Sequence, residues 1–360
     1  MAKLVIKVLG VIFLVLFLIY LFYSPRLKFD VLENPNKTVS TNHSDQTPKT
    51  HNTTENPAPK EGVGTWIGKD IDTLTDKFGQ ASRTYPFKGH YMNYVFKKDN
   101  QYYIVSTKEH KIKSVYATGN KANVAPLKIN ESASRIFENT SINPDPSIKV
   151  DGQRYNFELS DEDIKTQTLI KYGNVYAQVY VDQQSNQIMG IRFLDKETLA
   201  FLKPYPLANE TEEDDKGDNF NNAQKDKLPY EQNPNQLMTL YEITNEMREL
   251  KNIKPLKVNS DIAHIASVNL YEATGSNDVE FTEDALKSQL SNENISFTTT
   301  SQNVGYDFDD VPTLIHSWMN SDMHRSRMLN TKYEEMGGEV MKDYYSLIFG
   351  SKRNAVDETN

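Results

Sequence analysis

The 360-residue chain contains no cysteine. This absence excludes disulfide bonds, thiolate nucleophiles and zinc sites built from cysteine ligands. Positive charge is also in short supply, because 40 Lys and Arg residues stand against 49 Asp and Glu residues, for a formal net charge of −9. The negative net charge therefore argues against nucleic acid or another anionic polymer as a partner of the whole chain, although a local basic patch could still bind one.

The first thirty residues differ in composition from the rest of the chain. Residues 4–23 are apolar apart from Lys7 and Gly10, and an α-helix of this length crosses a bilayer. The run ends in bulky residues at 20–23 instead of the small residues that precede a signal-peptide cleavage site. We therefore expect residues 1–30 to be an uncleaved signal anchor with a transmembrane helix. Basic residues flank both ends of the run, so charge alone does not set its orientation.

A polar segment follows the expected anchor. Residues 31–62 are dominated by Asn, Thr, Pro, Ser and Lys and contain few apolar residues. Such a composition buries too little apolar surface to offset the entropy lost on folding, so we expect a disordered stalk. A flexible coil of this length spans roughly 30 Å root-mean-square. A stalk of that reach suits domains that stand outside the cell, with the N-terminus inside.

An acidic, Asn-rich linker at residues 207–233 separates two predicted domains. The first, residues 63–206, contains a weak internal repeat, in which a pair of strand-like segments occurs again 76 residues later. Each pair follows a short helical segment, so we expect a duplicated α+β module whose halves bury their sheet faces against each other. The strand-like pairs are Tyr103–Val105 with Ile112–Val115 and Val179–Val181 with Ile188–Ile191, and the helical segments are Ile71–Phe78 and Ser132–Phe137.

The second predicted domain covers residues 234–351 and leaves a short tail at 352–360. Asn233 and Pro234 have the composition of a helix start, and apolar residues follow at helical spacing up to Leu250. Further helix starts are predicted at Ser260, Thr282 and Asp310, and a closing strand at Tyr344–Phe349.

Two motifs in the second domain are spaced as in a known family. Residues Trp318–Asn330 read W-x-x-S-x-x-H-R-x-x-x-L-N, and an earlier helical segment carries Asn245 and Arg248 as N-x-x-R. Residues 234–351 therefore resemble the bacterial form of the CAP superfamily, also called SCP/PR-1-like. The resemblance implies that this domain is an α-β-α sandwich.

The first domain has a resemblance of its own. Residues 63–206 resemble the CAP-associated N-terminal domain that precedes some bacterial CAP domains, and this resemblance implies no particular chemistry. The segments that carry it are Trp66–Lys69, Phe78–Arg83, Tyr116–Gly119 and Ile191–Lys196.

The CAP resemblance also implies a polar cleft, part of which is missing here. Complete CAP domains bring two histidines and two acidic residues together around a divalent metal such as zinc. His324 keeps its place, whereas Gln302 stands where an acidic residue is usual and Glu280–Thr282 stands where the other histidine is usual. The candidate cleft residues are His324, Ser321, Gln302, Asn303 and His316, with His324 the one metal ligand, and the motif residues expected to brace the fold are Asn245, Arg248, Trp318, Arg325 and Asn330.

The candidate histidines also have structural interpretations. His324 either contacts a ligand or holds the loop around Trp318. His316 and His264 are expected to be packed or surface histidines. The spacing of Ser321 and His324 is too common to predict a hydrolytic triad, because no orienting acid is placed beside them.

The sequence thus predicts a single-pass membrane protein with two extracellular domains and a degenerate CAP site. We expect non-catalytic binding of a cell-wall component or another envelope protein, no contact with nucleic acid and no obligatory cofactor. Two alternatives stay open. One is a metal-dependent hydrolase acting on a peptide or cell-wall polymer, with zinc at His324, and the other is a lipid-binding carrier.

Overall fold

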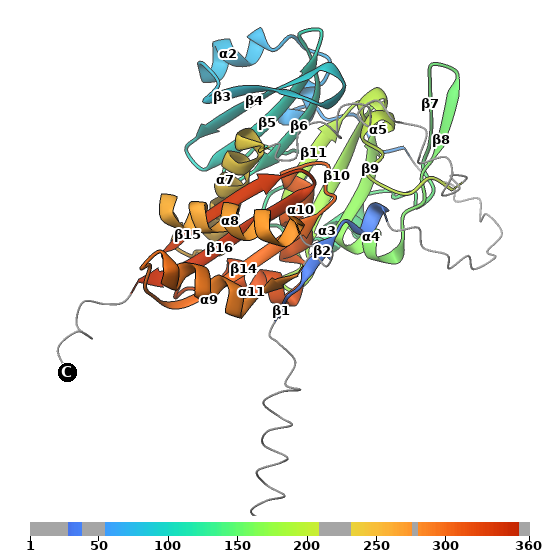
Figure 1. Ribbon diagram of the computed structural model, residues 1–360. Coiled ribbons are helices and arrows are strands. Elements are labelled where there is room, and N and C mark those ends of the chain that lie inside the picture. The colour runs from blue at the N-terminus through green and yellow to red at the C-terminus, as the bar shows by residue number, and fades with distance from the viewer. Residues whose placement is uncertain (1–27, 38–54, 209–231, 276–279, 353–360) are drawn as a thin grey trace, which may run out of the picture.

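A computed structural model describes residues 28–37, 55–208, 232–275 and 280–352 of the protein. The expected membrane segment, residues 4–23, lies outside these ranges, as do most of the expected linker and tail. Among the helices of the described ranges, none is both long and apolar enough to cross a bilayer. The described chain forms two modules, each built on its own sheet (Figure 1).

The N-terminal module, residues 55–208, contains a seven-stranded antiparallel sheet in the order β3-β4-β5-β6-β11-β10-β9. The central strands are rich in aromatic and β-branched residues, which suits strands covered on both faces. The strands are β3 (Arg83–Phe87), β4 (Tyr91–Lys98), β5 (Gln101–Lys108), β6 (Lys111–Thr118), β9 (Gln167–Tyr172), β10 (Val175–Asp182) and β11 (Gln187–Leu194). Around them lie η2 (Val63–Trp66), α2 (Asp72–Phe78), η3 (Lys88–His90), α3 (Ser134–Asn139), the hairpin β7 (Ser147–Val150) and β8 (Gln153–Asn156), α4 (Asp161–Thr166) and α5 (Lys196–Leu202).

The internal repeat is present, but its halves are arranged differently from the prediction. Both pairs of strand-like segments form hairpins, β5–β6 and β10–β11, as expected. The halves do not stack face to face, because β6 pairs with β11, with Val115 opposite Phe193, and the two hairpins continue one sheet. Joining at the edge satisfies the backbone hydrogen bonds of both strands and leaves the sheet faces to be covered by other elements.

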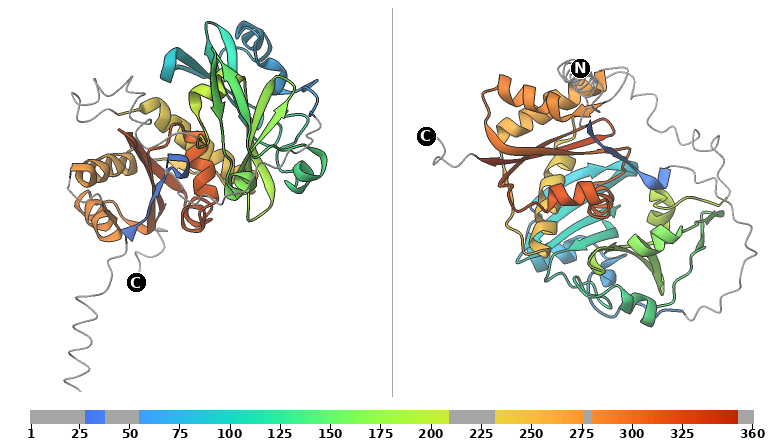
Figure 2. Two further views of the ribbon diagram at one scale, coloured as in Figure 1. Left: turned by 90° about the vertical axis from the view of Figure 1, so that its right-hand side faces the viewer. Right: turned by 90° about the horizontal axis from the view of Figure 1, so that it is seen from below.

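The C-terminal module consists of residues 28–37 with residues 232–352, and its five-stranded sheet has the order β12-β15-β16-β14-β2. The strands are β2 (Val31–Glu33), β12 (Lys257–Val258), β14 (Phe297–Tyr306), β15 (Glu335–Met341) and β16 (Tyr344–Lys352), and β1 (Lys28–Phe29) pairs separately with β13 (Phe281–Thr282). Helices α8 (Ser260–Gly275) and α9 (Glu283–Asn292) cover one face, and α7 (Pro234–Leu250), α10 (Val311–Met319) and α11 (Asp322–Met328) cover the other (Figure 2). This is the α-β-α sandwich that the resemblance implied.

Two adjacent glycines in β15 let helices approach the sheet on both faces. A Cβ atom at Gly337 would lie 2.2 Å from the backbone nitrogen of Ala263 in α8. One at Gly338, on the opposite face, would lie 3.3 Å from Leu237 of α7. Any larger residue at Gly337 would therefore push α8 away from the sheet.

The helices α7 and α10 lie between the two sheets (Figure 2). One side of this helical layer packs on the five-stranded sheet, and α10 also contacts β10 of the N-terminal module. A single hydrophobic cluster includes Val179 and Ile191 from the large sheet together with Leu240 and Ile315 from the helices. The two modules therefore share one core and form a single body.

Most of the predicted helix starts have the expected caps. The side chains of Asn233, Thr282 and Asp310 each accept a hydrogen bond from the backbone N–H three residues later, at 3.1, 3.1 and 2.9 Å. The start of α8 differs, because Asn259 and not Ser260 provides the cap oxygen, which accepts from the N–H groups of the second and third residues after it.

The predicted stalk, residues 31–62, is wrong over the parts that the structure describes. Val31 lies in β2, which runs parallel to β14. The predicted anchor, residues 1–30, is also wrong at its end, because Phe29 lies in β1 and is only 8% exposed. Further along, the side chain of Asn56 donates hydrogen bonds to two backbone carbonyls of the N-terminal module. Residues 38–54 lie outside the described ranges. A few apolar residues suffice to dock an extended segment when a sheet edge supplies its backbone partners, and a composition average hides them.

We expect Gly337→Ala to lower the free energy of unfolding by about 2 to 3 kcal/mol, because the added methyl group meets helix backbone that must shift. Urea unfolding followed by fluorescence measures this loss. The matched control is Gly275→Ala at the end of α8, where a Cβ atom has nothing within 4 Å, and it should change stability by no more than about 1 kcal/mol. Equal effects of the two variants would contradict the close approach of α8.

Candidate functional site

His324 lies in a closed environment where α11 meets the edge of the five-stranded sheet. Its ring stacks on that of Trp318, with centroids 6.1 Å apart and an interplanar angle of 6°. Nδ1 lies 2.8 Å from the hydroxyl of Ser321, and Nε2 lies 3.1 Å from the backbone carbonyl oxygen of Asp30. Only 2% of His324 is exposed.

Both ring nitrogens of His324 therefore have partners. The carbonyl of Asp30 can only accept, so Nε2 donates to it, and Nδ1 accepts from the hydroxyl of Ser321. Burial lowers the pKa of His324, and the nearby guanidinium of Arg327 acts in the same direction. The ring is neutral at pH 7, and its one lone pair is engaged within the protein.

The N-terminal strands seal this site from outside. Phe29 of β1 lies under the guanidinium of Arg327, with 5.1 Å between the guanidinium carbon and the ring centroid. Just beyond β2, the backbone N–H of Asn34 donates to the carbonyl of Tyr306 at 3.1 Å. The segment that supplies the Asp30 carbonyl is thus held on both sides of that residue.

The other cleft candidates do not converge on His324. Gln302 and Asn303 are neighbours in β14, so their side chains project to opposite faces of the sheet. Asn303 donates to the backbone carbonyl of His324 at 2.9 Å. Gln302 instead donates to Asn269 of α8 and to Ser346, each at 2.9 Å, on the face away from α11.

These residues do not fit a zinc site. Zinc needs three or four ligand atoms around one point, and Gln302 lies across the sheet from His324. Throughout the described ranges, no group of three or more His, Asp or Glu side chains is arranged to hold one ion. The motif around His324 builds packing and hydrogen bonds within the protein.

His316 is enclosed between the two modules. From α10, its Nε2 lies 2.9 Å from the hydroxyl of Tyr116, and its ring stacks on Tyr180 with centroids 4.2 Å apart. Burial, helped by the nearby Arg192, lowers the pKa of His316 to about 3, so the ring is neutral. Gly190 in β11 permits this approach, because a Cβ atom there would lie 2.9 Å from Nε2. His316 is thus a packed histidine in the module junction, apart from the surroundings of His324.

Arg248 and Asn245 brace backbone segments, as expected. The fully buried guanidinium of Arg248 donates to the carbonyls of Met328 and Asn330, at 2.6 and 3.0 Å. The amide of Asn245 both donates to and accepts from the backbone of Leu256. Arg248 thus ties α7 to the end of α11 and the turn after it, and Asn245 ties α7 to the segment before β12.

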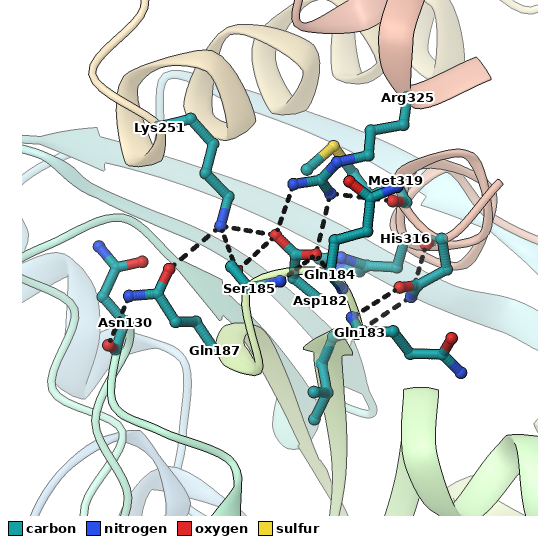
Figure 3. A network of polar contacts seen from close by, with 12 residues as sticks. Asn130, Asp182, Gln183, Gln184, Ser185, Gln187, Lys251, His316, Met319 and Arg325 are labelled. Carbon is teal, nitrogen blue, oxygen red and sulfur yellow. Dashed lines mark hydrogen bonds and ion pairs between the residues drawn. The ribbon is translucent and has the colours of Figure 1, made fainter. Parts of the chain in front are cut away.

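Arg325, the arginine of the His-Arg motif, joins the two modules. Its two terminal nitrogens each lie 2.9 Å from an oxygen of Asp182, the last residue of β10. Lys251, just after α7, reaches the same carboxylate at 2.6 Å, and the hydroxyl of Ser185 donates to it at 2.7 Å (Figure 3). We call Asp182, Lys251 and Arg325 the Asp182 lock.

The carboxylate of Asp182 is ionised well below neutral pH. The residue is fully buried, and burial alone would raise its pKa. The hydrogen bonds from Lys251, Ser185 and Arg325 outweigh this effect and lower the pKa of Asp182 to about 2. Asp182 is therefore ionised throughout the physiological pH range.

Further ion pairs cross the same junction, among them two that involve Arg192 and Arg83. Arg192 of β11 lies 2.7 Å from Asp310, whose other carboxylate oxygen caps α10. Arg83 of β3 lies 2.9 Å from Glu242 of α7, and the hydroxyl of Tyr102 donates to the same carboxylate at 2.8 Å. All of these pairs place a strand of the large sheet against a helix of the middle layer.

Comparison with known proteins identifies the family. The family model "CAP-associated N-terminal" matches residues 67–205, and the model "Cysteine-rich secretory protein family" matches residues 241–349. The crystal structure of a cysteine-rich secretory protein from Staphylococcus aureus subsp. aureus Mu50 is 63% identical, with 91% of this chain and 100% of that chain covered and a TM-score of 0.79. The chain belongs to the CAP family. It does so without the cysteines for which the family is named.

Two more distant relatives also match over most of this chain. An extracellular protein containing an SCP domain from Bacillus anthracis str. Ames is 25% identical, with 85% of this chain and 100% of that chain covered and a TM-score of 0.70. An uncharacterized membrane protein, YlbC, from Bacillus subtilis (strain 168) is 27% identical over 300 residues, which are 81% of this chain and 84% of that protein.

This CAP protein also has a pocket at the junction of its modules. The pocket has a volume of about 30 Å³ and lies between the large sheet and the helices α7 and α10. Its wall includes Tyr91, Phe201, Asn93, Ser114 and the paired Arg192 and Asp310. The exposed ring of Phe201 stacks on Tyr91, with centroids 5.1 Å apart, and forms part of the rim.

Two polar groups in the pocket wall are left without partners. Asn93 and Ser114 are only 5% and 4% exposed. Within the described chain, the amide nitrogen of Asn93 and the hydroxyl of Ser114 make no hydrogen bond, although the amide oxygen of Asn93 accepts one from Ser106 at 2.7 Å. These two groups therefore have hydrogen-bonding capacity that water or a bound molecule can use.

Sequence reasoning missed the module junction. Asp182 stands at the end of an ordinary hairpin, and nothing near it in the sequence marks it as a partner of Arg325, 143 residues away. The one usable signal was the arginine of the His-Arg motif, which was correctly given a structural role but no partner.

We expect Asp182→Asn to lower the free energy of unfolding at pH 7 by about 3 kcal/mol, because two largely buried cations would lose their fully buried counter-charge. The pKa of Asp182 falls from 3.8 to about 2 on folding, so its stabilising effect is present above pH 4 and is lost as the pH falls through 2. Urea unfolding of both proteins between pH 7 and pH 2 should show the difference narrowing in acid.

The control for this prediction is Asp322→Asn, the same change at an exposed position of the junction, where the carboxylate accepts from Gln184. It should cost less than about 0.5 kcal/mol. A difference between Asp182→Asn and wild type that stayed constant down to pH 2 would show that the charge of Asp182 is not what stabilises the junction.

Proposed function

We propose that this CAP protein is a non-catalytic binding protein of the cell envelope, anchored in the membrane by residues 4–23 with both modules outside the cell. The observation that carries the proposal is the closed surrounding of His324, whose two nitrogens are occupied by Ser321 and Asp30. A hydrolase that used this histidine to bind metal or to activate water would need one nitrogen free. One that used Ser321 as nucleophile and His324 as its base would need substrate to reach a histidine that is only 2% exposed.

The envelope setting is supported by the sequence and by relatives. Residues 4–23 have the length and composition of a membrane span. The relative from B. subtilis is called a membrane protein, and the relative from B. anthracis is called extracellular. An anchor followed by external modules reconciles the two descriptions.

The pocket at the module junction favours an uncharged ligand that contains a sugar ring. The two charged residues in its wall, Arg192 and Asp310, neutralise each other at 2.7 Å. The rim offers the exposed face of Phe201, on which the apolar face of a sugar ring packs. The interior is large enough for one small polar group, which would meet the free groups of Asn93 and Ser114. A glycan of the cell wall has these properties.

We expect Phe201→Ala to weaken binding of the purified modules, residues 28–360, to isolated cell-wall polymer by about tenfold, the effect of losing one aromatic contact. Co-sedimentation with washed cell walls measures the affinity. The matched control is Phe137→Ala on α3, since Phe137 is 49% exposed, as against 42% for Phe201, but lies outside the pocket. Equal binding by the two variants would place the ligand elsewhere, and release of soluble wall fragments during the assay would favour the hydrolase.

Addition of zinc tests whether His324 is closed to metal, as the same proposal requires. A ligand at a hundred times its dissociation constant stabilises a protein by about 2.7 kcal/mol. We expect no such shift in the unfolding midpoint of residues 28–360 when zinc is added, either in wild type or in His324→Ala. A zinc-dependent shift in wild type that disappears in His324→Ala would mean that the site opens to metal, and the hydrolase interpretation would then replace this one.

A further inference from the structure

We infer that the C-terminal module rests directly on the lipid headgroups, with the surface around β1 and α9 facing the bilayer. This inference depends on the membrane anchor proposed above and goes beyond it by fixing which surface faces the lipid. It replaces the picture of domains held away from the membrane by a stalk.

The first step is the length of chain between the apolar run and the fold. Only residues 24–27 separate the end of the run at Tyr23 from Lys28, the first residue of β1. Five Cα steps cover at most about 17 Å even when fully extended. The headgroup layer itself occupies about 5 to 8 Å on each side of the hydrocarbon core. The backbone of Lys28 therefore lies within about 10 Å of the headgroup surface.

The second step is that β1 and β2 belong to the folded body. Lys28 forms an ion pair with Glu280, Phe29 is buried against α8 and β13, and β2 pairs with β14. The body therefore cannot move along the chain away from residue 28. The long polar segment that could have served as a spacer comes after β2 and joins two parts of the same body.

The third step is which surface this attachment presents to the lipid. β1 pairs with β13 immediately before α9, so these elements surround the point where the chain enters the module. The helix α2 and the strands β3 and β4 lie at the opposite end of the molecule (Figure 1). The surface near β1 carries Glu280, Glu283 and Asp284 as well as Lys28, so attraction to anionic lipids does not hold it in place. The short connection does.

The test uses the absence of native cysteine. Two variants of the full chain, Glu280→Cys and Asp76→Cys, each replace one exposed acidic residue, the first beside Lys28 and the second on α2. Each is labelled with a small fluorophore and reconstituted in phosphatidylcholine liposomes that carry nitroxide groups on the headgroups of both leaflets. We expect at least about threefold stronger quenching at position 280 than at position 76. The short connection keeps position 280 near the headgroup quenchers, whereas position 76 lies at the opposite end of the molecule.

A third variant isolates the cause. Insertion of roughly twelve Gly and Ser residues between residues 27 and 28 adds about 20 Å of flexible reach without altering the folded body. It should abolish most of the difference between the two labels, whereas raising the salt concentration should not change it.

The outcomes separate the inference from the proposal on which it rests. Liposome flotation of the labelled chain is measured first, and a chain that does not float overturns the anchor and the placement together. A chain that floats but shows equal quenching at positions 280 and 76, or a difference that the insertion leaves intact, overturns the placement and leaves the membrane anchor standing.

Discussion

The architecture depends on the charge of Asp182 at the end of β10. Its carboxylate receives Arg325 from α11 and Lys251 from the end of α7, so one buried anion fixes two helices of the C-terminal module to the large sheet. Removing either kind of partner would leave unpaired charge in a buried junction, which costs more than an exposed ion pair is worth. The helical layer between the sheets, the stacked His316 and the junction pocket all rely on this alignment.

The same arrangement gives the residues of the CAP motif structural roles in this chain. The arginine next to His324 holds the other module, and the histidine itself is closed by a backbone carbonyl from the N-terminal strands. Residues that could line an open cleft in a complete site are here divided between two faces of a sheet. In this chain the motif residues build the junction and the sheet edge.

Local patterns in the sequence predicted the elements well and their long-range contacts poorly. The helices starting after Asn233, Thr282 and Asp310 could be predicted because caps and apolar spacing are local properties. The pairing of β2 with β14 could not be predicted, since a strand of only three residues in a polar segment has no periodic pattern. The join of β6 to β11 was also missed, because a repeat shows that two halves are alike but not how they meet.

In the candidate site, too, local features could be predicted from the sequence and long-range contacts could not. Arg248 could be assigned as a brace from the family motif, and the loss of the acidic residue at Gln302 pointed to an incomplete site. The carbonyl of Asp30 on His324 could not be foreseen, because Asp30 lies 294 residues away, at the end of the segment predicted to be the signal anchor. The partners of Asp182 could not be foreseen for the same reason, because Arg325 of α11 and Lys251 after α7 are both far from it in the sequence.

The measurement that tests the account most directly is the titration of His324 by NMR in protein labelled at its seven histidines, with the His324 signal assigned from the spectrum of His324→Ala. A closed ring should remain neutral through the ordinary histidine range near pH 6.5, because burial lowers its pKa, and its nitrogen shifts should not respond to zinc. A ring that gains a proton near pH 6.5 and shifts on addition of zinc would be open to solvent and metal, and the closed, non-catalytic site would be refuted.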